Sequence, residues 1–144
     1  MISYTVLRNP KYNLKSKVTC DASGHAIWVI LSQLDTHERE YVCAYTSHIL
    51  WNAEINYTIT EKECLAVIYA IKKYDIYLSG RHFRIITNHI AHKWLKNIKE
   101  PSNRLSRWTI YIQEYDFEIV HRDAISRIPS DKLIMLLEVK LKKN

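Results

Sequence analysis

The chain is poor in the residues that interrupt regular secondary structure. Its 144 residues include only two glycines and three prolines, so helices and strands are expected to dominate. No apolar run approaches the ~18 residues of a membrane-spanning helix, and residues 1–17 lack the apolar segment of a signal peptide. We therefore expect a soluble intracellular protein with no membrane partner, and nothing here separates the cytoplasm from the nucleus.

Cysteine is scarce and is not arranged as a disulfide framework or a zinc site. Cys20, Cys43 and Cys64 are odd in number, have no C-x-x-C spacing and each lie in an apolar segment. This pattern indicates buried free thiols in a reducing compartment.

Negative charge is also under-represented. Lys plus Arg number 21 against 15 for Asp plus Glu, which gives a net charge of +6 and a pI near 9.2. A basic balance suits a polyanionic partner such as nucleic acid, although many basic proteins bind none. The length fits one domain that buries about two-thirds of the surface exposed by its unfolded chain.

Hydrophobic periodicity predicts alternating blocks of strands and helices. The expected strands are residues 18–21, 26–32, 41–46, 82–87 and 117–121, and the expected helices are residues 60–78, 91–97, 102–113, 124–127 and 131–142. Short connections favour antiparallel pairing of the first three strands. The helix between the first and fourth strands makes a crossover, so these two strands should be parallel neighbours. The pattern predicts an α/β fold with a five-stranded mixed sheet, in which three antiparallel strands are followed by two parallel ones and helices flank the sheet.

Four polar segments follow the strands or open the helices, and three of them contain a carboxylate. The candidate residues are Asp21, Glu63, Asn88 and Asp123. Asp21 and Asn88 fall at the ends of the two strands expected to be parallel, where ligands bind in open α/β sheets. Carboxylates from separate elements that meet in a small volume suit a two-metal phosphodiester hydrolase.

Each of these residues also has an ordinary structural interpretation. Asp21 precedes Ser-Gly, a common hairpin signal, and spacing alone does not separate a turn role from a site role. Asp123 stands where a helix N-cap is expected. Asn88 is an ordinary loop residue. The case for a site therefore depends on the joint arrangement.

The first long helix has a similar ambiguity at its start. Thr60 and Glu63 have the spacing of a capping box, and spacing alone favours this role for Glu63. Glu61 is interpreted as a favourable charge in the first helical turn.

Basic residues near the two later helices are candidates for nucleic-acid contacts. Arg104 and Arg107 have i, i+3 spacing, and Lys93 precedes Trp94. For Trp94 and Trp108 we favour a role as core anchors beneath this basic surface.

Taken together, the segments resemble the ribonuclease H domain of reverse transcriptases from gypsy-type LTR retrotransposons. The resemblance runs from about Val6 to Pro129. It is carried by residues 20–23, 29–33, 44–47, 56–66, 77–83, 87–89, 93–95, 104–108, 114–119 and 123–127.

The resemblance implies a ribonuclease H-like fold that cuts the RNA strand of RNA–DNA hybrids with two Mg²⁺ ions, or with Mn²⁺ instead. Asp21, Glu63 and Asp123 match catalytic metal ligands of the family, and Asn88 occupies a ligand position that is Asp in the family. The polymerase and integrase parts of a polyprotein are further implied partners.

Four departures from the family bear on activity. Asn88 removes one negative charge, which predicts a loss of ~10²–10³ or more in rate. The Gly-x-x-Asn loop before Asp123 is missing. Trp28 replaces a Gly and His92 a core Leu, and each threatens about 1–3 kcal/mol of stability. We therefore expect hydrolysis to be weak or absent.

The expected organisation is a linker remnant at residues 1–17, the ribonuclease H-like domain at 18–129 and a basic helix or tail at 130–144. Two alternatives to an active nuclease stay open. The first is a non-catalytic nucleic-acid-binding or structural module, and the second is a decayed element copy without a folded product.

Overall fold

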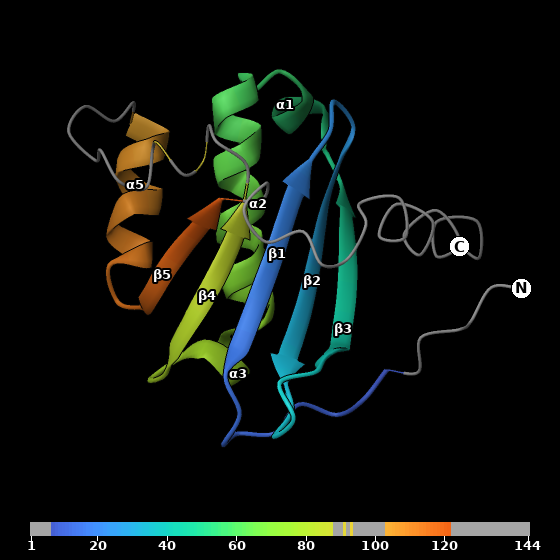
Figure 1. The fold of residues 1–144 in the computed structure, drawn as a ribbon. Coiled ribbons are helices and arrows are strands. Elements are labelled where there is room, and N and C mark those ends of the chain that lie inside the picture. Colours follow the sequence, from blue (N-terminus) through green and yellow to red (C-terminus); the bar gives the residue numbers. More distant parts are fainter. Residues whose placement is uncertain (1–6, 88–90, 92, 94–102, 122–144) are drawn as a thin grey trace, which may run out of the picture.

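The computed structural model describes residues 7–87, 91, 93 and 103–121, which form one sheet with helices packed on it (Figure 1). The strands are β1 (Ser16–Ala22), β2 (Ala26–Leu34), β3 (Glu40–Ile49), β4 (His82–Thr87) and β5 (Asp116–His121). The helices are α1 (Asn52–Ile55), α2 (Ile59–Lys73), α3 (Asp75–Leu78) and α5 (Asn103–Ile112). The helices expected at 124–127 and 131–142, and most of that at 91–97, lie outside the described residues.

The strands lie in the order β3-β2-β1-β4-β5. β1 pairs with β2, and β2 with β3, in antiparallel fashion. β4 is parallel to both β1 and β5. The predicted mixed sheet of three antiparallel strands followed by two parallel ones is therefore confirmed. Because β1 and β4 are parallel neighbours, their carboxyl ends meet at one edge of the sheet (Figure 1).

The main core lies between the sheet and α2, which packs on β1 and β2. Alternate residues of β1 point toward it, so Val18 and Cys20 are buried. Across from them, Val67 and Ile71 of α2 are fully buried. Each aliphatic side chain buried here contributes ~1.5–3 kcal/mol as an upper estimate.

The helix expected at 60–78 is two helices instead of one. Tyr74 leaves helical geometry, with φ −109° and ψ 22°, and separates α2 from α3. The end near Gly80 is as predicted, because Gly80 has a φ of 74° that other residues adopt at a cost. α1 was not expected, since its four residues are too few to show helical periodicity. In the described residues, no helix has the length and apolar character needed to cross a bilayer.

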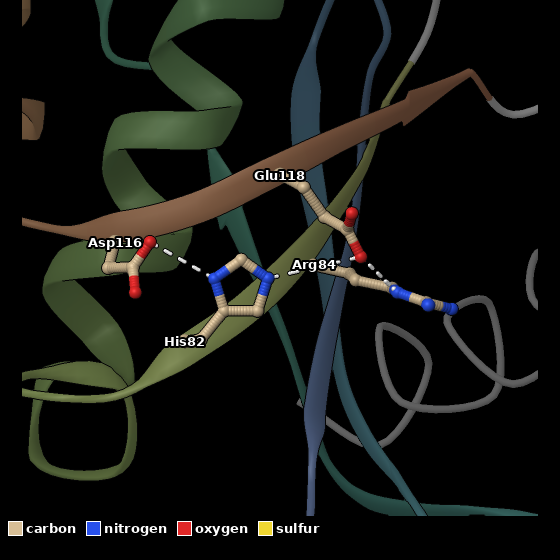
Figure 2. Close-up of polar contacts among 4 residues, drawn as sticks. All are labelled: His82, Arg84, Asp116 and Glu118. Atoms are coloured by element: carbon tan, nitrogen blue, oxygen red, sulfur yellow. Dashed lines mark hydrogen bonds and ion pairs between the residues drawn. The ribbon is translucent and has the colours of Figure 1, made fainter.

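The sheet face opposite α2 carries exposed charges on β4 and β5 (Figure 2). His82 lies beside Asp116, with 3.0 Å between Nδ1 and Oδ1, and Arg84 pairs with Glu118. Both pairs are direct neighbours in the β4–β5 register. Solvent screens such pairs, so each contributes little stability.

Candidate functional site

Asp21 lies within β1 and not in the turn that follows it. Its register partner is Trp28 of β2. Ser23 makes the turn, because its Oγ accepts hydrogen bonds from the backbone N–H groups of His25 (3.2 Å) and Ala26 (3.1 Å). The turn role considered for Asp21 is therefore wrong, and its carboxylate stands at the carboxyl end of a central strand.

Glu63 lies on the first turns of α2 but does not cap it. The N-cap is Thr58, whose Oγ1 accepts from the Glu61 N–H at 3.1 Å, while Glu61 Oε1 accepts from the Thr58 N–H at 3.1 Å. The capping box predicted for Thr60 and Glu63 is wrong by two residues. Glu63 belongs instead to the sheet-facing side of α2 and is only 7% exposed.

The charges of both carboxylates affect the pKa of the buried thiol of Cys20. Burial raises the pKa of Cys20, and the charges of Asp21 and Glu63 raise it further. Burial and the charge of Glu63 likewise raise the pKa of Cys64. The thiols of Cys20 and Cys64 therefore stay protonated at neutral pH and add no negative charge of their own to this part of β1 and α2.

A cluster at the start of α2 orients the turn that carries Glu63. Arg104 of α5 forms an ion pair with Glu61, and its guanidinium lies 3.9 Å from the centre of the Tyr57 ring. Tyr57 in turn contacts Trp108, with 6.2 Å between ring centres. On the other side, Lys62 Nζ donates to the carbonyl of Gly24 at 3.3 Å. α5 and the β1–β2 turn therefore both hold the amino end of α2.

Trp28 is half-buried beside Asp21 and is not fully enclosed. Its Nε1–H is buried, and among the described residues it has no hydrogen-bond acceptor. A buried donor left in this way costs about 1–3 kcal/mol. The loss of stability predicted for Trp28 therefore includes the cost of burying this N–H group without an acceptor. His92 lies outside the described residues.

The donor chemistry of this site suits a hard divalent cation. Two neighbouring carboxylates, one of them buried, are costly unless positive charge compensates them. Thr87, the last residue of β4, is also fully buried, and within the described chain its Oγ1 has no hydrogen-bond partner. Asn88 and Asp123 lie outside the described residues. In the part of the chain that is described, no three His, Cys, Asp or Glu residues form a metal-binding group.

The three basic candidates differ in their surroundings. Arg104 is engaged by Glu61 and Tyr57, and its hydrogen bond to Glu61 raises the pKa of its guanidinium. Lys93 and Arg107 are exposed. Trp108 packs against the main core, as predicted, and Trp94 lies outside the described residues.

Sequence reasoning missed the structural role of Glu61 and Arg104. The signal was present in Thr58-x-x-Glu61, which has the same capping-box spacing as Thr60-x-x-Glu63. Choosing between them requires the first helical residue, and sequence patterns locate helix ends poorly.

Residues 11–115 match the family model described as an RNase H-like domain found in reverse transcriptase. The chain is 37% identical over 131 residues to the retrovirus-related Pol polyprotein from transposon 297 of Drosophila melanogaster, covering 85% of this chain and 12% of the relative. It is 34% identical over 142 residues to the transposon Tf2-3 polyprotein of Schizosaccharomyces pombe, covering 89% and 10%. The chain thus spans about a tenth of the length of the curated relatives it matches.

Two solved structures share its fold. The foamy viral protease-reverse transcriptase in complex with RNA/DNA hybrid is 19% identical with a TM-score of 0.66, over 85% of this chain and 17% of that one. LC11-RNase H1 in complex with RNA/DNA hybrid is 14% identical with a TM-score of 0.52, over 83% of this chain and 88% of that one. At these identities the likeness concerns the fold alone.

Proposed function

The chain belongs to the RNase H-like domains found in retrotransposon reverse transcriptases, as its resemblance to gypsy-type elements predicted, and we propose that it hydrolyses the RNA strand of RNA–DNA hybrids. One observation carries this proposal. Helix α2, which carries the buried Glu63, packs on β1, which carries Asp21 near its carboxyl end, although the two residues are 42 positions apart (63 − 21). The two similar structures named above were each solved with an RNA/DNA hybrid, which supports the same substrate here.

We assign the catalytic cation site to Asp21, Glu63, Asn88 and Asp123, with two Mg²⁺ ions as its occupants and Mn²⁺ as a substitute. Bound in such a site, the cations would activate a water molecule and stabilise the leaving oxygen. Asp21 and Glu63 supply anionic oxygen atoms, and the packing of α2 on β1 holds them together. Because burial and nearby carboxylates raise their pKa, the thiols of Cys20 and Cys64 stay neutral and add no further anion beside the proposed site.

Hydrolysis by the natural chain is expected to be weak. Asn88 offers a carbonyl oxygen without charge where the family has Asp, so the site attracts cations less strongly. Losing one electrostatic group of this kind costs ~10²–10³ in rate. The shortened loop before Asp123 is a second expected source of impairment.

The test is cleavage of an end-labelled RNA–DNA hybrid in Mg²⁺ or Mn²⁺ by the natural chain, Asn88→Asp and Asn88→Asp/Glu63→Gln. We expect little cleavage by the first, at least ~10²-fold more by the second, and a return to the first level in the third. Calorimetric Mg²⁺ titration of the same variants should show tighter binding for Asn88→Asp. If Asn88→Asp neither cleaves the hybrid nor binds Mg²⁺ more tightly, the proposed nuclease site is refuted.

A non-catalytic nucleic-acid-binding module is the second candidate, favoured by the exposed basic residues Lys93 and Arg107 and by Asn88. It predicts hybrid binding that weakens steeply with salt, without cleavage by Asn88→Asp. Arg107→Ala should weaken binding. Arg104→Ala should lower stability as well, because Arg104 holds Glu61 and Tyr57. Affinity that does not change with salt would contradict this candidate.

A further inference from the structure

A pocket lies at the end of the sheet opposite Asp21 and Glu63. It has a volume of about 560 Å³ and lies between the segment 8–14 and the β2–β3 turn with the start of β3, residues 35–41. Its volume is in the ~300–1,000 Å³ range of small-molecule sites. β1 runs from Ser16, near this pocket, to Asp21, so the two sites are separated by roughly 17 Å of strand. Whatever binds here is not in contact with the candidate catalytic carboxylates.

One side of the pocket is held in place because the buried side-chain amide of Gln33 connects the segment 8–14 to the sheet by hydrogen bonds. Gln33, only 2% exposed, accepts from the Lys11 N–H at 2.9 Å and donates to the Lys11 carbonyl at 2.9 Å. It also accepts from the Tyr41 hydroxyl at 2.9 Å and donates to the Ser16 hydroxyl at 3.1 Å. Farther along, the Arg8 N–H donates to the Val42 carbonyl at 3.2 Å. Arg8 and Lys11 are therefore placed at the pocket by backbone hydrogen bonds.

The two carboxylates that line the pocket are already compensated. Asp35 accepts from the N–H groups of His37 (2.8 Å) and Arg39 (2.9 Å), and the Arg39 guanidinium lies 3.6 Å away. Glu40 pairs with Lys17 at 2.7 Å and accepts from the Ser32 hydroxyl at 2.8 Å. Lys17 is not part of the pocket lining, so it neutralises Glu40 from outside.

The two cations contributed by the segment 8–14 have no such compensation. Neither Arg8 nor Lys11 has a carboxylate within ion-pair distance in the described part of the chain. The guanidinium of Arg8 lies 4.1 Å from the centre of the Tyr41 ring. A cation–π contact of this kind uses none of the guanidinium N–H groups as hydrogen-bond donors to a carboxylate, so they are available to an anion. The pocket is therefore lined by two positive charges that have no carboxylate partner among the described residues, and one of them is a guanidinium placed over the Tyr41 ring.

We propose that this pocket binds a phosphate group. A guanidinium matches two phosphate oxygens, and the Lys11 ammonium adds a point charge. The side chains of Asn13 and Thr36 line the same space and supply neutral hydrogen-bond donors. The volume accommodates a nucleotide unit around that phosphate. The phosphate is supplied by a nucleic-acid backbone or by a free nucleotide, and the site does not depend on the proposed hydrolysis.

The test is backbone amide NMR of the full chain at constant ionic strength, titrated separately with inorganic phosphate, adenosine 5′-monophosphate and a short RNA–DNA hybrid. Every probe whose phosphate enters the pocket should shift the backbone amide resonances of residues 8–13, apart from the proline at position 10, and of residues 35–41. Shifts produced there by the mononucleotide and not by the hybrid identify a free nucleotide as the source, and the reverse pattern identifies a nucleic-acid backbone. Shifts with no probe, or shifts spread over all basic surfaces, would overturn the proposal.

Substitutions distinguish specific phosphate binding in the pocket from a general effect of the net charge of the protein. Arg8→Gln and Lys11→Gln should each weaken binding at the pocket about tenfold. Lys73→Gln is the matched control, because Lys73 is exposed at the end of α2 and removing it changes the net charge equally. Arg8→Lys keeps the charge but loses the planar donor, so it should bind more weakly than the natural chain and more tightly than Arg8→Gln. Equal weakening by Lys73→Gln would refute the pocket.

Discussion

The two ends of the sheet each bury a polar side chain, but they use it in opposite ways. At the far end, Gln33 is 2% exposed and its amide makes four hydrogen bonds inside the protein. At the carboxyl end of β1, Glu63 is 7% exposed and brings a negative charge beside that of Asp21. A neutral buried amide with all its partners stabilises the fold, whereas burial of an ionised carboxylate costs stability to the extent that positive charge and hydrogen bonds do not compensate it. The effect of a buried polar group on stability therefore depends on its charge as well as on its burial.

The largest effect is expected from Glu63→Gln in the Asn88→Asp background. Hybrid cleavage should fall by at least ~10²-fold, because an anionic ligand is lost. Stability in the absence of divalent cations should stay the same or rise, since the substitution removes a buried charge. The measurements are the cleavage assay and urea unfolding, and Glu38→Gln in the exposed β2–β3 turn is the control. A marked loss of stability would mean that Glu63 serves the fold, and the comparison would fail.

Gln33→Ala should have the largest effect on stability. The substitution leaves the Tyr41 hydroxyl and the Lys11 backbone groups without their partner, so the free energy of unfolding should fall by about 2–4 kcal/mol. Urea denaturation followed by circular dichroism measures it. The exposed Gln113 at the end of α5 provides the control Gln113→Ala, expected to change stability by less than about 0.5 kcal/mol. Similar losses for both variants would contradict the role given to Gln33.

Glu61→Gln should cost about 1 kcal/mol at neutral pH, because Glu61 takes part in the capping box and pairs with Arg104. Burial acts to raise the pKa of Glu61, but hydrogen bonds from Thr58 and Arg104 outweigh it and lower the pKa below its ordinary value of 4.5. A carboxyl with a lowered folded-state pKa stabilises the protein above 4.5 and loses that contribution as the pH falls through the folded-state pKa.

The difference in unfolding free energy between the natural chain and Glu61→Gln should therefore shrink as the pH drops below about 4.5. Thermal unfolding between pH 7 and pH 3 measures it. A difference that grows on acidification would show that the ionised form is not the stabilising one.

The smallest effect is expected on the exposed face of β4 and β5 (Figure 2). In a double-mutant cycle of Arg84→Ala and Glu118→Ala, the coupling energy should be about 0.2–1 kcal/mol and should decrease with added salt. Solvent reaches both side chains, which are 44% and 47% exposed. Coupling above about 2 kcal/mol would show that this face is less screened than the exposure indicates.

Much of the fold could be predicted because strand patterns and crossover rules act locally. The apolar runs in residues 26–32 and 82–87 predicted β2 and β4. Short connections predicted the antiparallel pairs of β2 correctly, and the crossover helix predicted the parallel pairing of β4 with β1 correctly. The break at Tyr74 and the helix α1 were not predicted, because each depends on packing over a few residues. At the candidate site, the residues could be selected from the sequence, but the choice between a turn or cap and a site could not be made.

By itself the sequence determined the family, the order of the strands and the identity of the candidate cation ligands, because these depend on residue type and spacing along the chain. Only the tertiary structure decided that Thr58 and not Thr60 caps α2, that Arg104 is held by Glu61, and that Arg8 and Lys11 meet the β2–β3 turn. The physical reason is that ion pairing and compensation of charge depend on distances between atoms of separate segments, while the choice of cap depends on which residue begins the helix. Those distances are set by how α2, α5 and the segment 8–14 pack on the sheet.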